Sequence, residues 1–131
     1  MKLQLSDPTL LKSMAYIDGE WRPATNGSSF TVKNPATGEV IADVTDLGAA
    51  ETRAAIAAAQ QAMISWRQQP AKERSAILRR WFNLIMDNQE DLARLMTAEQ
   101  GKVLAESRLE ITYAASFVEW FAEEAKRIYG D

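Results

Sequence analysis

The pattern of hydrophobic and polar positions divides this chain into an amino-terminal part with strand and turn signals, up to residue 44, and a helical part from residue 46 onward. In the first part, Asp18-Gly19 lies between two short runs, Tyr16-Ile17 and Glu20-Trp21. This dipeptide suits the positive backbone φ angles of a type I′ turn, so we expect a β-hairpin. A second hairpin is predicted from strands at 29–32 and 40–44, joined by a loop that contains Pro, Asn and Gly.

An Ala-rich stretch begins the helical part and predicts a first helix over 49–66, with Asp46 as its cap or close to it. A second helix is expected over 71–86. Its apolar residues fall on one face, which we expect to point inward; they are Ile77, Leu78, Trp81, Leu84 and Ile85. Trp81 and Trp120 are expected in the core, because both lie in helices rich in apolar residues.

Two further helices complete the pattern. Asp87 or Asn88 is expected to cap a third helix that ends at Gln100, where Gly101 suits a left-handed C-cap. This helix is expected to bury Leu92, Leu95 and Met96. The fourth helix is predicted over 103–129, closed by Gly130, with an apolar stripe of Ala114, Phe117, Val118, Phe121, Ala125 and Ile128. The predicted fold class is α+β, with two short hairpins followed by four helices and an amino-terminal arm at 1–14.

Composition narrows the function classes. With 131 residues, 47% hydrophobic and 25% charged, the chain has the size and composition of one globular domain. A net charge of −3 offers no basic surface for phosphate backbones, so no nucleic-acid partner is expected. No apolar run approaches the roughly 20 residues that span a bilayer, so we expect a cytoplasmic protein without membrane contact. The chain has no Cys and no His, which excludes a thiol nucleophile from these residues.

The remaining candidate chemistry is sparse. The six glycines are too scattered for a phosphate-binding loop. Glu106 with Glu110, and Glu119 with Glu123, have the spacing of metal-binding or acid–base pairs, but without His a solvated helix face is the favoured interpretation. Glu123 is also expected to form an ion pair with Arg127. An arginine cluster, made of Arg74, Arg79 and Arg80, is interpreted as a helix surface or interface rather than an anion site.

Several stretches share one family resemblance. They are Tyr16-Ile17-Asp18-Gly19-Glu20-Trp21, the turn at 34–39, Lys72-Glu73-Arg74-Ser75-Ala76-Ile77-Leu78-Arg79, the run from Leu95 to Glu106, and the run from Glu110 to Asp131. Together they resemble, in the same order, the amino-terminal region of aldehyde dehydrogenases, and most of all succinate-semialdehyde dehydrogenases. The resemblance spans 15–131. One departure is Val103, where the family usually has Pro, a residue that suits the first turn of a helix.

The resemblance implies that residues 15–131 form the amino-terminal part of the α/β aldehyde dehydrogenase fold. They would be an incomplete portion of its cofactor-binding domain, with hairpins at 15–44 and helices at 46–131. The family oxidises an aldehyde, here succinate semialdehyde or a related one, with NAD or NADP through a thioester on a Cys. Its catalytic Cys, Glu and Asn and its dinucleotide-binding residues lie downstream of the residues matched here. We therefore expect no catalytic residue, no cofactor binding and no activity from this chain alone.

Two site assignments carry over from the family to this chain. The backbone carbonyl of Lys33 and the side chain of Glu99 match two ligands of a structural Na⁺ or K⁺ ion, with a third ligand missing. Tyr113 and Phe117 match the helix that approaches the aldehyde tunnel in the family, so the resemblance offers both as substrate-entrance residues, one of which would contact the substrate. Packing in the core is the favoured interpretation for both aromatic residues.

Two functions from different classes remain open. The first is the amino-terminal segment of a semialdehyde dehydrogenase, whose partners are the remainder of its own chain and further copies in a homo-oligomer. Apolar stripes left exposed in such a segment invite self-association. The second is a truncated, non-catalytic interaction module that self-associates through Phe117, Val118 and Phe121. Independent catalysis with NAD is disfavoured, because no residue present can serve as the family's nucleophile.

Overall fold

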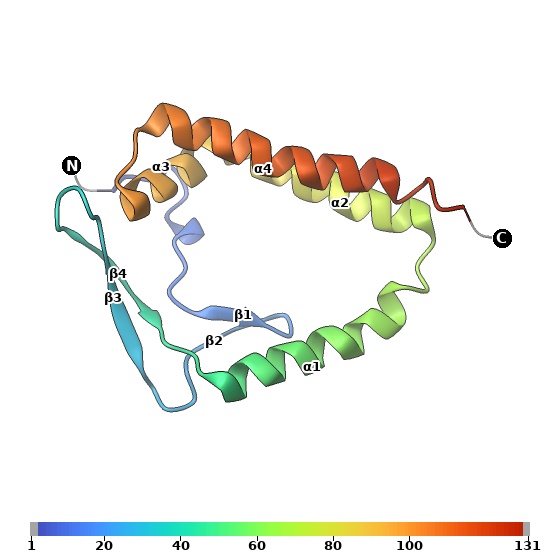
Figure 1. Cartoon of the computed structure of the whole chain (residues 1–131), viewed down its shortest axis with the longest axis horizontal. Coiled ribbons are helices and arrows are strands. Elements are labelled where there is room, and N and C mark those ends of the chain that lie inside the picture. Colours follow the sequence, from blue (N-terminus) through green and yellow to red (C-terminus); the bar gives the residue numbers. More distant parts are fainter. Residues whose placement is uncertain (1–2, 130–131) are drawn as a thin grey trace.

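The structure is a computed structural model that describes residues 3–129, in which two small antiparallel sheets precede four α-helices (Figure 1). In chain order the elements are the 3₁₀ helix η1 (Pro8–Leu10), β1 (Ala15–Ile17), β2 (Glu20–Arg22), β3 (Ser29–Lys33), β4 (Val40–Thr45), α1 (Ala49–Trp66), α2 (Ala71–Asp87), α3 (Gln89–Gln100) and α4 (Leu104–Glu124). Each strand pairs within its own hairpin. The expected α+β arrangement is confirmed.

The first hairpin follows from the backbone freedom of two residues. Asp18 has a φ of 55° and Gly19 a φ of 79°, the left-handed values that a type I′ turn requires at both central positions. In the resulting register Tyr16 lies opposite Trp21, and their ring centroids are 5.1 Å apart. The hairpin predicted from Asp18-Gly19 is confirmed.

The second hairpin is longer and irregular at its loop end. Its strands keep a regular antiparallel register until a shift between Val32 and Lys33. Asn34 then closes the loop, because its backbone N–H donates to the Glu39 carbonyl at 2.9 Å and its Oδ1 accepts the Ala36 N–H at 2.9 Å. Both predicted strands are confirmed, and each extends one residue further than expected.

The start of α1 is fixed by Glu51, and Gly48 rather than Asp46 holds the cap position, with Asp46 close to it as the second alternative of the prediction allowed. The Glu51 carboxylate accepts the N–H of Gly48, the residue before the helix, and the N–H of Thr25, both at 3.1 Å. Hydrogen bonding to Thr25 is the largest cause that lowers the pKa of Glu51 to about 2. Asp46 lies before the cap, and its carbonyl accepts the Ser28 hydroxyl at 2.9 Å.

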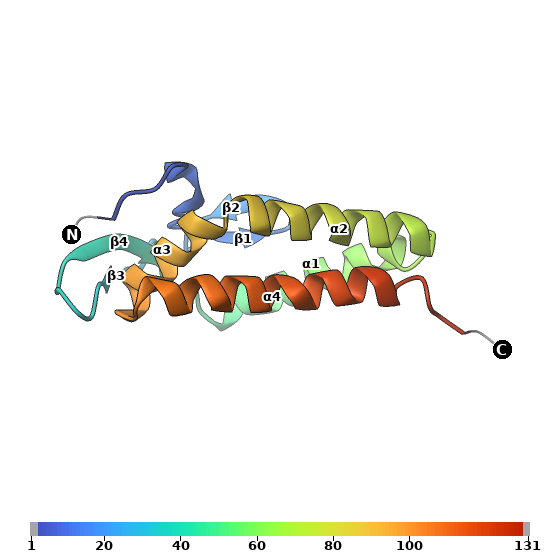
Figure 2. The same cartoon turned by 90° about the horizontal axis from the view of Figure 1, so that it is seen from above.

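Helices α2 and α4 pack side by side, and α3 packs against the start of α4 (Figure 2). Apart from Asp91, the buried side chains of these three helices are mostly small: Ser75, Ala93, Ala98, Ser107, Ile111, Ala115 and Ala122. We call the buried face of α4 its seam; it is formed by Ser107, Ile111, Ala115 and Ala122. Small residues on this face let the helix backbones approach closely. Helix α1 runs separately, as Figure 1 shows, and none of its residues is buried.

The large apolar side chains expected inside α2 and α4 mostly lie outside. Leu78 and Ile85 are half-buried as part of the α2–α4 contact, but Trp81 and Trp120 are 55% and 62% exposed, so the prediction that they are core residues was wrong. The other exposed members of the two predicted stripes are Ile77, Leu84, Ala114, Phe117, Phe121 and Ile128. The physical reason is that α4 turns mostly small residues toward the seam, so its bulky residues point away, while Ile77, Trp81 and Leu84 of α2 lie on a different face from Leu78 and Ile85.

Helix α3 ends as predicted, with Gly101 in a left-handed conformation at a φ of 70°. Its apolar residues Leu92, Leu95 and Met96 are half-buried. Asn88 holds the cap position, but its side chain donates backward to the Leu84 carbonyl at 2.8 Å instead of capping α3.

Helix α4 ends at Glu124, five residues before the predicted end. The chain then tightens into turns in which the N–H of Lys126 donates to the Glu123 carbonyl and that of Arg127 to the Glu124 carbonyl. The Arg127 side chain consequently pairs with Glu124 at 2.9 Å, so the predicted Glu123–Arg127 pair was wrong. The expected closing residue, Gly130, lies outside the described residues. Within residues 3–129 no helix has the length and hydropathy needed to cross a bilayer.

Candidate functional site

The two residues assigned to the substrate entrance lie together on the outer face of α4. The rings of Tyr113 and Phe117 meet edge to face with their centroids 4.9 Å apart. Tyr113 is 66% exposed and Phe117 is 48% exposed, so within the described residues neither packs in a core. A shallow hollow of about 630 Å³ extends from Phe117 along α4 to Trp120 and Phe121. This face offers apolar and aromatic surface and no nucleophile.

The two residues assigned to the cation site come from elements that touch. Lys33 ends β3, Glu99 lies in the last turn of α3, and these two elements are in contact. The residues that follow these elements also approach closely, because a Cβ atom at Gly101 would lie 2.9 Å from Cγ of Pro35. The donors are a backbone carbonyl and a carboxylate, oxygen ligands of the kind that hard cations take. No cluster of three or more Asp, Glu, His or Cys residues suited to a metal ion occurs in residues 3–129.

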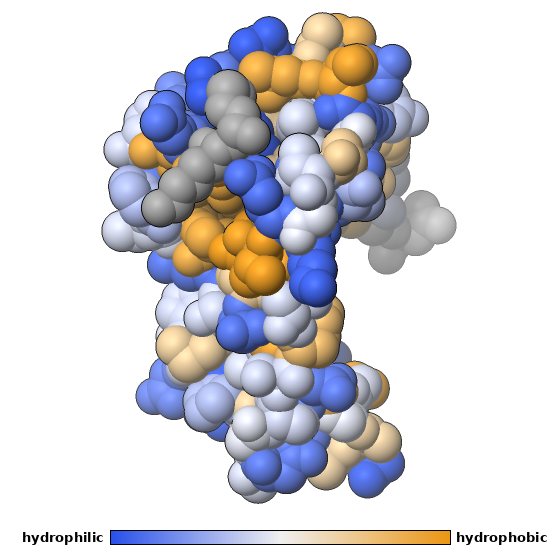
Figure 3. All heavy atoms as spheres, turned by 90° about the vertical axis from the view of Figure 1, so that its left-hand side faces the viewer, coloured by the Kyte–Doolittle hydropathy of each residue, from blue (hydrophilic) through white to orange (hydrophobic). Residues whose placement is uncertain are grey.

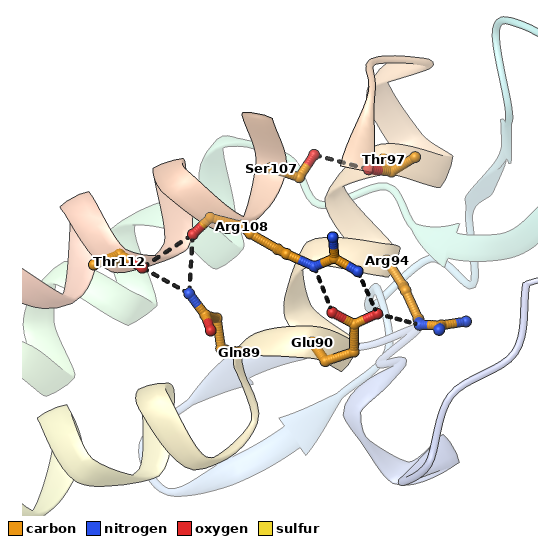
Figure 4. A network of polar contacts seen from close by, with 7 residues as sticks. All are labelled: Gln89, Glu90, Arg94, Thr97, Ser107, Arg108 and Thr112. Carbon is orange, nitrogen blue, oxygen red and sulfur yellow. Dashed lines mark hydrogen bonds and ion pairs between the residues drawn. The ribbon is translucent and has the colours of Figure 1, made fainter. Parts of the chain in front are cut away.

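A polar network that sequence reasoning missed joins α3 to α4 (Figure 4). The Glu90 carboxylate accepts two hydrogen bonds from Arg108, at 2.7 and 3.0 Å, and one from Arg94 at 3.0 Å. Arg108 is the largest cause that lowers the pKa of Glu90 to about 2. Beside it, the Gln89 amide donates to Oγ1 of Thr112 at 2.6 Å. The i, i+4 spacing of Glu90 and Arg94 was the one sequence signal for this network.

Three of the four carboxylates that the sequence offered as possible metal ligands form ion pairs with cations of the protein itself, and within residues 3–129 Glu106 is the exception. Arg79 of α2 reaches Glu119 and Glu123 of α4, with both nitrogen–oxygen distances at 2.6 Å. Glu110 forms an ion pair with Lys102. These contacts confirm that Arg79 is part of a helix interface, and the network and the Arg79 pairs hold the three helices together.

A groove of about 860 Å³ lies at the end of the molecule where the amino-terminal arm, the β3–β4 hairpin and α3 meet. Its apolar lining comes from four residues of the arm, two of β4 and one of α3. They are Leu3, Leu5, Pro8 and Leu11, then Val40 and Ile41, then Ala98. Figure 3 shows hydrophobic atoms gathered at the surface on this side of the molecule. The groove carries no nucleophile and no phosphate-binding loop.

Comparison with known sequences connects this arrangement to one family. The model of the aldehyde dehydrogenase family matches residues 21–131. The chain is 64% identical over 129 residues to the glutarate-semialdehyde dehydrogenase of Pseudomonas putida, and 59% identical over 129 residues to the NADP(+) succinate-semialdehyde dehydrogenase of Escherichia coli. Each match covers 98% of this chain and 27% of the relative. The chain therefore spans about a quarter of the length of the curated relatives it matches.

Solved structures give the same result for the fold. An NADP-dependent enzyme of Escherichia coli matches with a TM-score of 0.95 and 59% identity, over 98% of this chain and 27% of that one. A succinate-semialdehyde dehydrogenase from Burkholderia pseudomallei matches with a TM-score of 0.93 and 57% identity, over 97% of this chain and 26% of that one. The sequence and the fold thus agree, and the chain belongs to the aldehyde dehydrogenase family, of which it represents an amino-terminal portion.

Proposed function

We propose that this chain is the amino-terminal segment of an NAD(P)-dependent semialdehyde dehydrogenase that oxidises succinate semialdehyde or a related aldehyde to the acid. The observation that carries the proposal is the 64% identity, over nearly the whole chain, to a glutarate-semialdehyde dehydrogenase. Relatives named for succinate semialdehyde and 3-sulfolactaldehyde, at 59% and 55% identity, support a substrate that pairs an aldehyde with an acidic group.

The proposal assigns catalysis to residues beyond this chain. A thioester mechanism needs a thiolate, and no Cys is present here. A dinucleotide site needs donors for a pyrophosphate, and the scattered glycines form no such loop. Residues 15–131 would then form an incomplete portion of the cofactor-binding domain, with Tyr113 and Phe117 at the substrate entrance. Lys33 and Glu99 would supply two ligands of a Na⁺ or K⁺ ion whose third ligand comes from elsewhere.

An activity assay of the complete natural polypeptide tests the proposal. Succinate semialdehyde, glutarate semialdehyde and 3-sulfolactaldehyde are each supplied with NAD⁺ and with NADP⁺, and the formation of reduced nicotinamide is followed. We expect oxidation of at least one semialdehyde by the complete polypeptide and none by residues 1–131 alone. A complete polypeptide that is inactive on all three, or activity of residues 1–131 alone, contradicts the proposal. Fractionation of the source cells tests the cytoplasmic location that we propose with it.

A second candidate function, a non-catalytic module that self-associates, is favoured by the exposed aromatic surface of α4. Phe117 and Phe121 are both exposed there, while Val118 is half-buried beside them. Sedimentation of the natural polypeptide distinguishes the two functions. A polypeptide of about 14.6 kDa that forms a defined oligomer and melts cooperatively supports the module, whereas a polypeptide several times larger supports the dehydrogenase.

A further inference from the structure

Asn26 is the one asparagine of this chain that is followed by a glycine. The pair lies in the loop that joins β2 to β3, beside the start of α1 (Figure 1), and both residues are exposed. The side-chain amide of an asparagine is an electrophile at Cγ, and the backbone nitrogen of the next residue is a nucleophile within its reach. Asn26-Gly27 therefore brings the two reacting groups of a deamidation together at an exposed position.

Gly27 leaves its backbone nitrogen accessible for attack on Cγ of Asn26. A side chain on the residue after an asparagine shields that nitrogen, and glycine has none. A Cβ atom at Gly27 would meet no heavy atom of residues 3–129 within 4 Å, apart from its chain neighbours. One contact opposes the reaction, because the Gly27 N–H donates to the Ala24 carbonyl at 2.9 Å. This exposed turn has to open before the nitrogen can lose its proton.

Ser28 polarises the amide that would be attacked. Its backbone N–H donates to Oδ1 of Asn26 at 2.9 Å, and its hydroxyl lies 2.7 Å from the same oxygen. Attack on Cγ turns Oδ1 into an oxyanion, and donors that already point at such an oxygen lower the barrier to its formation. The hydroxyl also lies 2.9 Å from the Asp46 carbonyl, so its single proton has two acceptors within reach.

The other three asparagines lack this arrangement. Asn34 precedes Pro35, whose nitrogen carries no hydrogen and cannot act as the nucleophile. Asn83 lies in the middle of α2, where the backbone N–H groups take part in the helix. The side chain of Asn88 donates backward to the Leu84 carbonyl at 2.8 Å, which holds its amide in the preceding turn. Asn26 alone combines an exposed loop, a glycine and a polarised amide.

We propose that Asn26 is a site of spontaneous deamidation, promoted by the donors of Ser28. The Gly27 nitrogen forms a bond to Cγ of Asn26 and gives up its proton, and the Cγ–Nδ2 bond breaks, so the amide leaves as ammonia. The succinimide ring that remains adds one water molecule. Opening at one carbonyl gives aspartate, and opening at the other gives isoaspartate, in which the Gly27 nitrogen stays bonded to the former side chain. No oxidant or cofactor takes part, and the reaction does not depend on the proposed function.

Isoaspartate at position 26 would lengthen the backbone of this loop by one carbon atom. Hydrogen bonds hold the loop on both sides of that point. The Thr25 N–H donates to Glu51 at 3.1 Å, and the Ser28 carbonyl accepts the N–H of Asp46 at 3.0 Å. Because these contacts fix both ends of the turn, the added carbon shifts at least one of them. The modification therefore loosens the hold of the loop on the start of α1.

Incubation of the complete natural polypeptide at mildly alkaline pH tests the site. Samples taken over several days are digested at mildly acidic pH, where the succinimide forms slowly, and mass spectrometry measures the conversion of each asparagine. We expect conversion at Asn26 to be several times faster than at Asn83 or Asn88, with isoaspartate among the products. If Asn26 keeps its amide as long as Asn88 does, the proposal is wrong.

Two serine variants test the role of Ser28. Ser28→Ala removes the hydroxyl beside Oδ1 of Asn26, and Ser29→Ala removes the exposed hydroxyl of the next residue. We expect Ser28→Ala to slow conversion at Asn26 by about fivefold, the effect of one ordinary hydrogen bond, and Ser29→Ala to leave it unchanged. Equal rates in the two variants, or faster conversion in Ser28→Ala, would show that the hydroxyl does not promote the reaction.

Hydrogen exchange measures the effect on the start of α1. The Thr25 amide should exchange faster in the incubated polypeptide than in the fresh one, because its partner Glu51 is held less closely. An Asn26→Ala variant has no amide to lose, so its Thr25 amide should exchange at the same rate before and after incubation. Unchanged exchange in a parent sample that contains isoaspartate would overturn the loosening of the loop.

Discussion

The carboxylate of Asp91 accepts the backbone N–H of Ser6 at 2.9 Å, across 85 positions of sequence. Its second oxygen accepts the N–H of Asp7 at 2.8 Å. Asp91 is buried, and these two backbone donors are the main reason that its pKa is lowered. One side chain of α3 thus holds the amino-terminal arm, which lies before the residues that the family model matches.

Asp91→Asn should release this arm. An amide offers one acceptor oxygen where the carboxylate offers two, so one of the two backbone N–H groups loses its charged partner. Hydrogen exchange of the Ser6 and Asp7 amides in the complete polypeptide is expected to accelerate by about tenfold or more. Asp87→Asn, at an exposed position of α2, is the matched control. Unchanged exchange at both amides would show that Asp91 does not hold the arm.

Glu90→Gln should change how the stability of the protein depends on pH. The folded-state pKa of Glu90 is about 2, below its ordinary value of 4.5, so the ionised form is favoured by folding. Its contribution is present above about pH 4.5 and is lost as the pH falls toward 2. The variant should therefore lose less stability than the parent over this range. Thermal unfolding at a series of pH values measures the difference.

Glu106→Gln provides the control for the pH experiment. Glu106 is exposed on α4, and no hydrogen bond or ion pair joins its side chain to another residue in 3–129. The loss of stability of the Glu106→Gln variant below about pH 4.5 should follow that of the parent protein. If the Glu90 and Glu106 variants lose stability in parallel, then the pairing of Glu90 with Arg108 does not govern the acid response.

Gly101→Ala should destabilise the protein through two effects that a control can separate. Gly101 has a φ of 70°, which alone disfavours Ala by about 1 kcal/mol, and a Cβ atom there would also approach Cγ of Pro35 to 2.9 Å. Gly27 has a similar φ of 72° but open space around it. Denaturant unfolding should show a larger loss for Gly101→Ala than for Gly27→Ala. Equal losses would mean that the Pro35 contact relaxes without cost.

Phe117→Ala should affect the use of substrate if α4 faces the aldehyde entrance. In the complete polypeptide we expect KM for the semialdehyde to rise severalfold while kcat changes little, because a residue at an entrance contributes to binding rather than to the chemical step. Leu109→Ala, at an exposed position of the same helix, should leave both constants near their original values. A fall in kcat with unchanged KM would contradict the assignment of Phe117 to the entrance.

The features that the sequence predicted well depend on one or two neighbouring residues. The Asp18-Gly19 turn and the end of α3 at Gly101 follow from backbone preferences, which act locally wherever the rest of the chain lies. The cation-site and entrance residues came from family resemblance alone. Neither the periodicity nor the composition of the chain points to Lys33 or Tyr113.

The features that the sequence did not predict depend on which surfaces meet. Apolar spacing located α4 but not the face it buries, because the Ala and Ser residues of the seam carry little hydrophobic signal beside Phe117 and Phe121. Arg108 meets Glu90 from 18 positions away, through a turn whose geometry no periodicity describes. The core prediction fails for Trp81 and Trp120 because it assumes that bulky apolar residues face inward. Within residues 3–129, no other element covers them.

The small-residue seam of α4 also sets a limit on how this segment can vary. With no side chain larger than Ile111 at its buried positions, the seam keeps the axes of α2 and α4 at a short, fixed spacing. A bulkier residue at Ala115 or Ala122 would push the helices apart and shift every group carried on their outer faces. Ala115 and Ala122 thus act as a spacer that sets the position of the Tyr113–Phe117 pair on the outer face of α4.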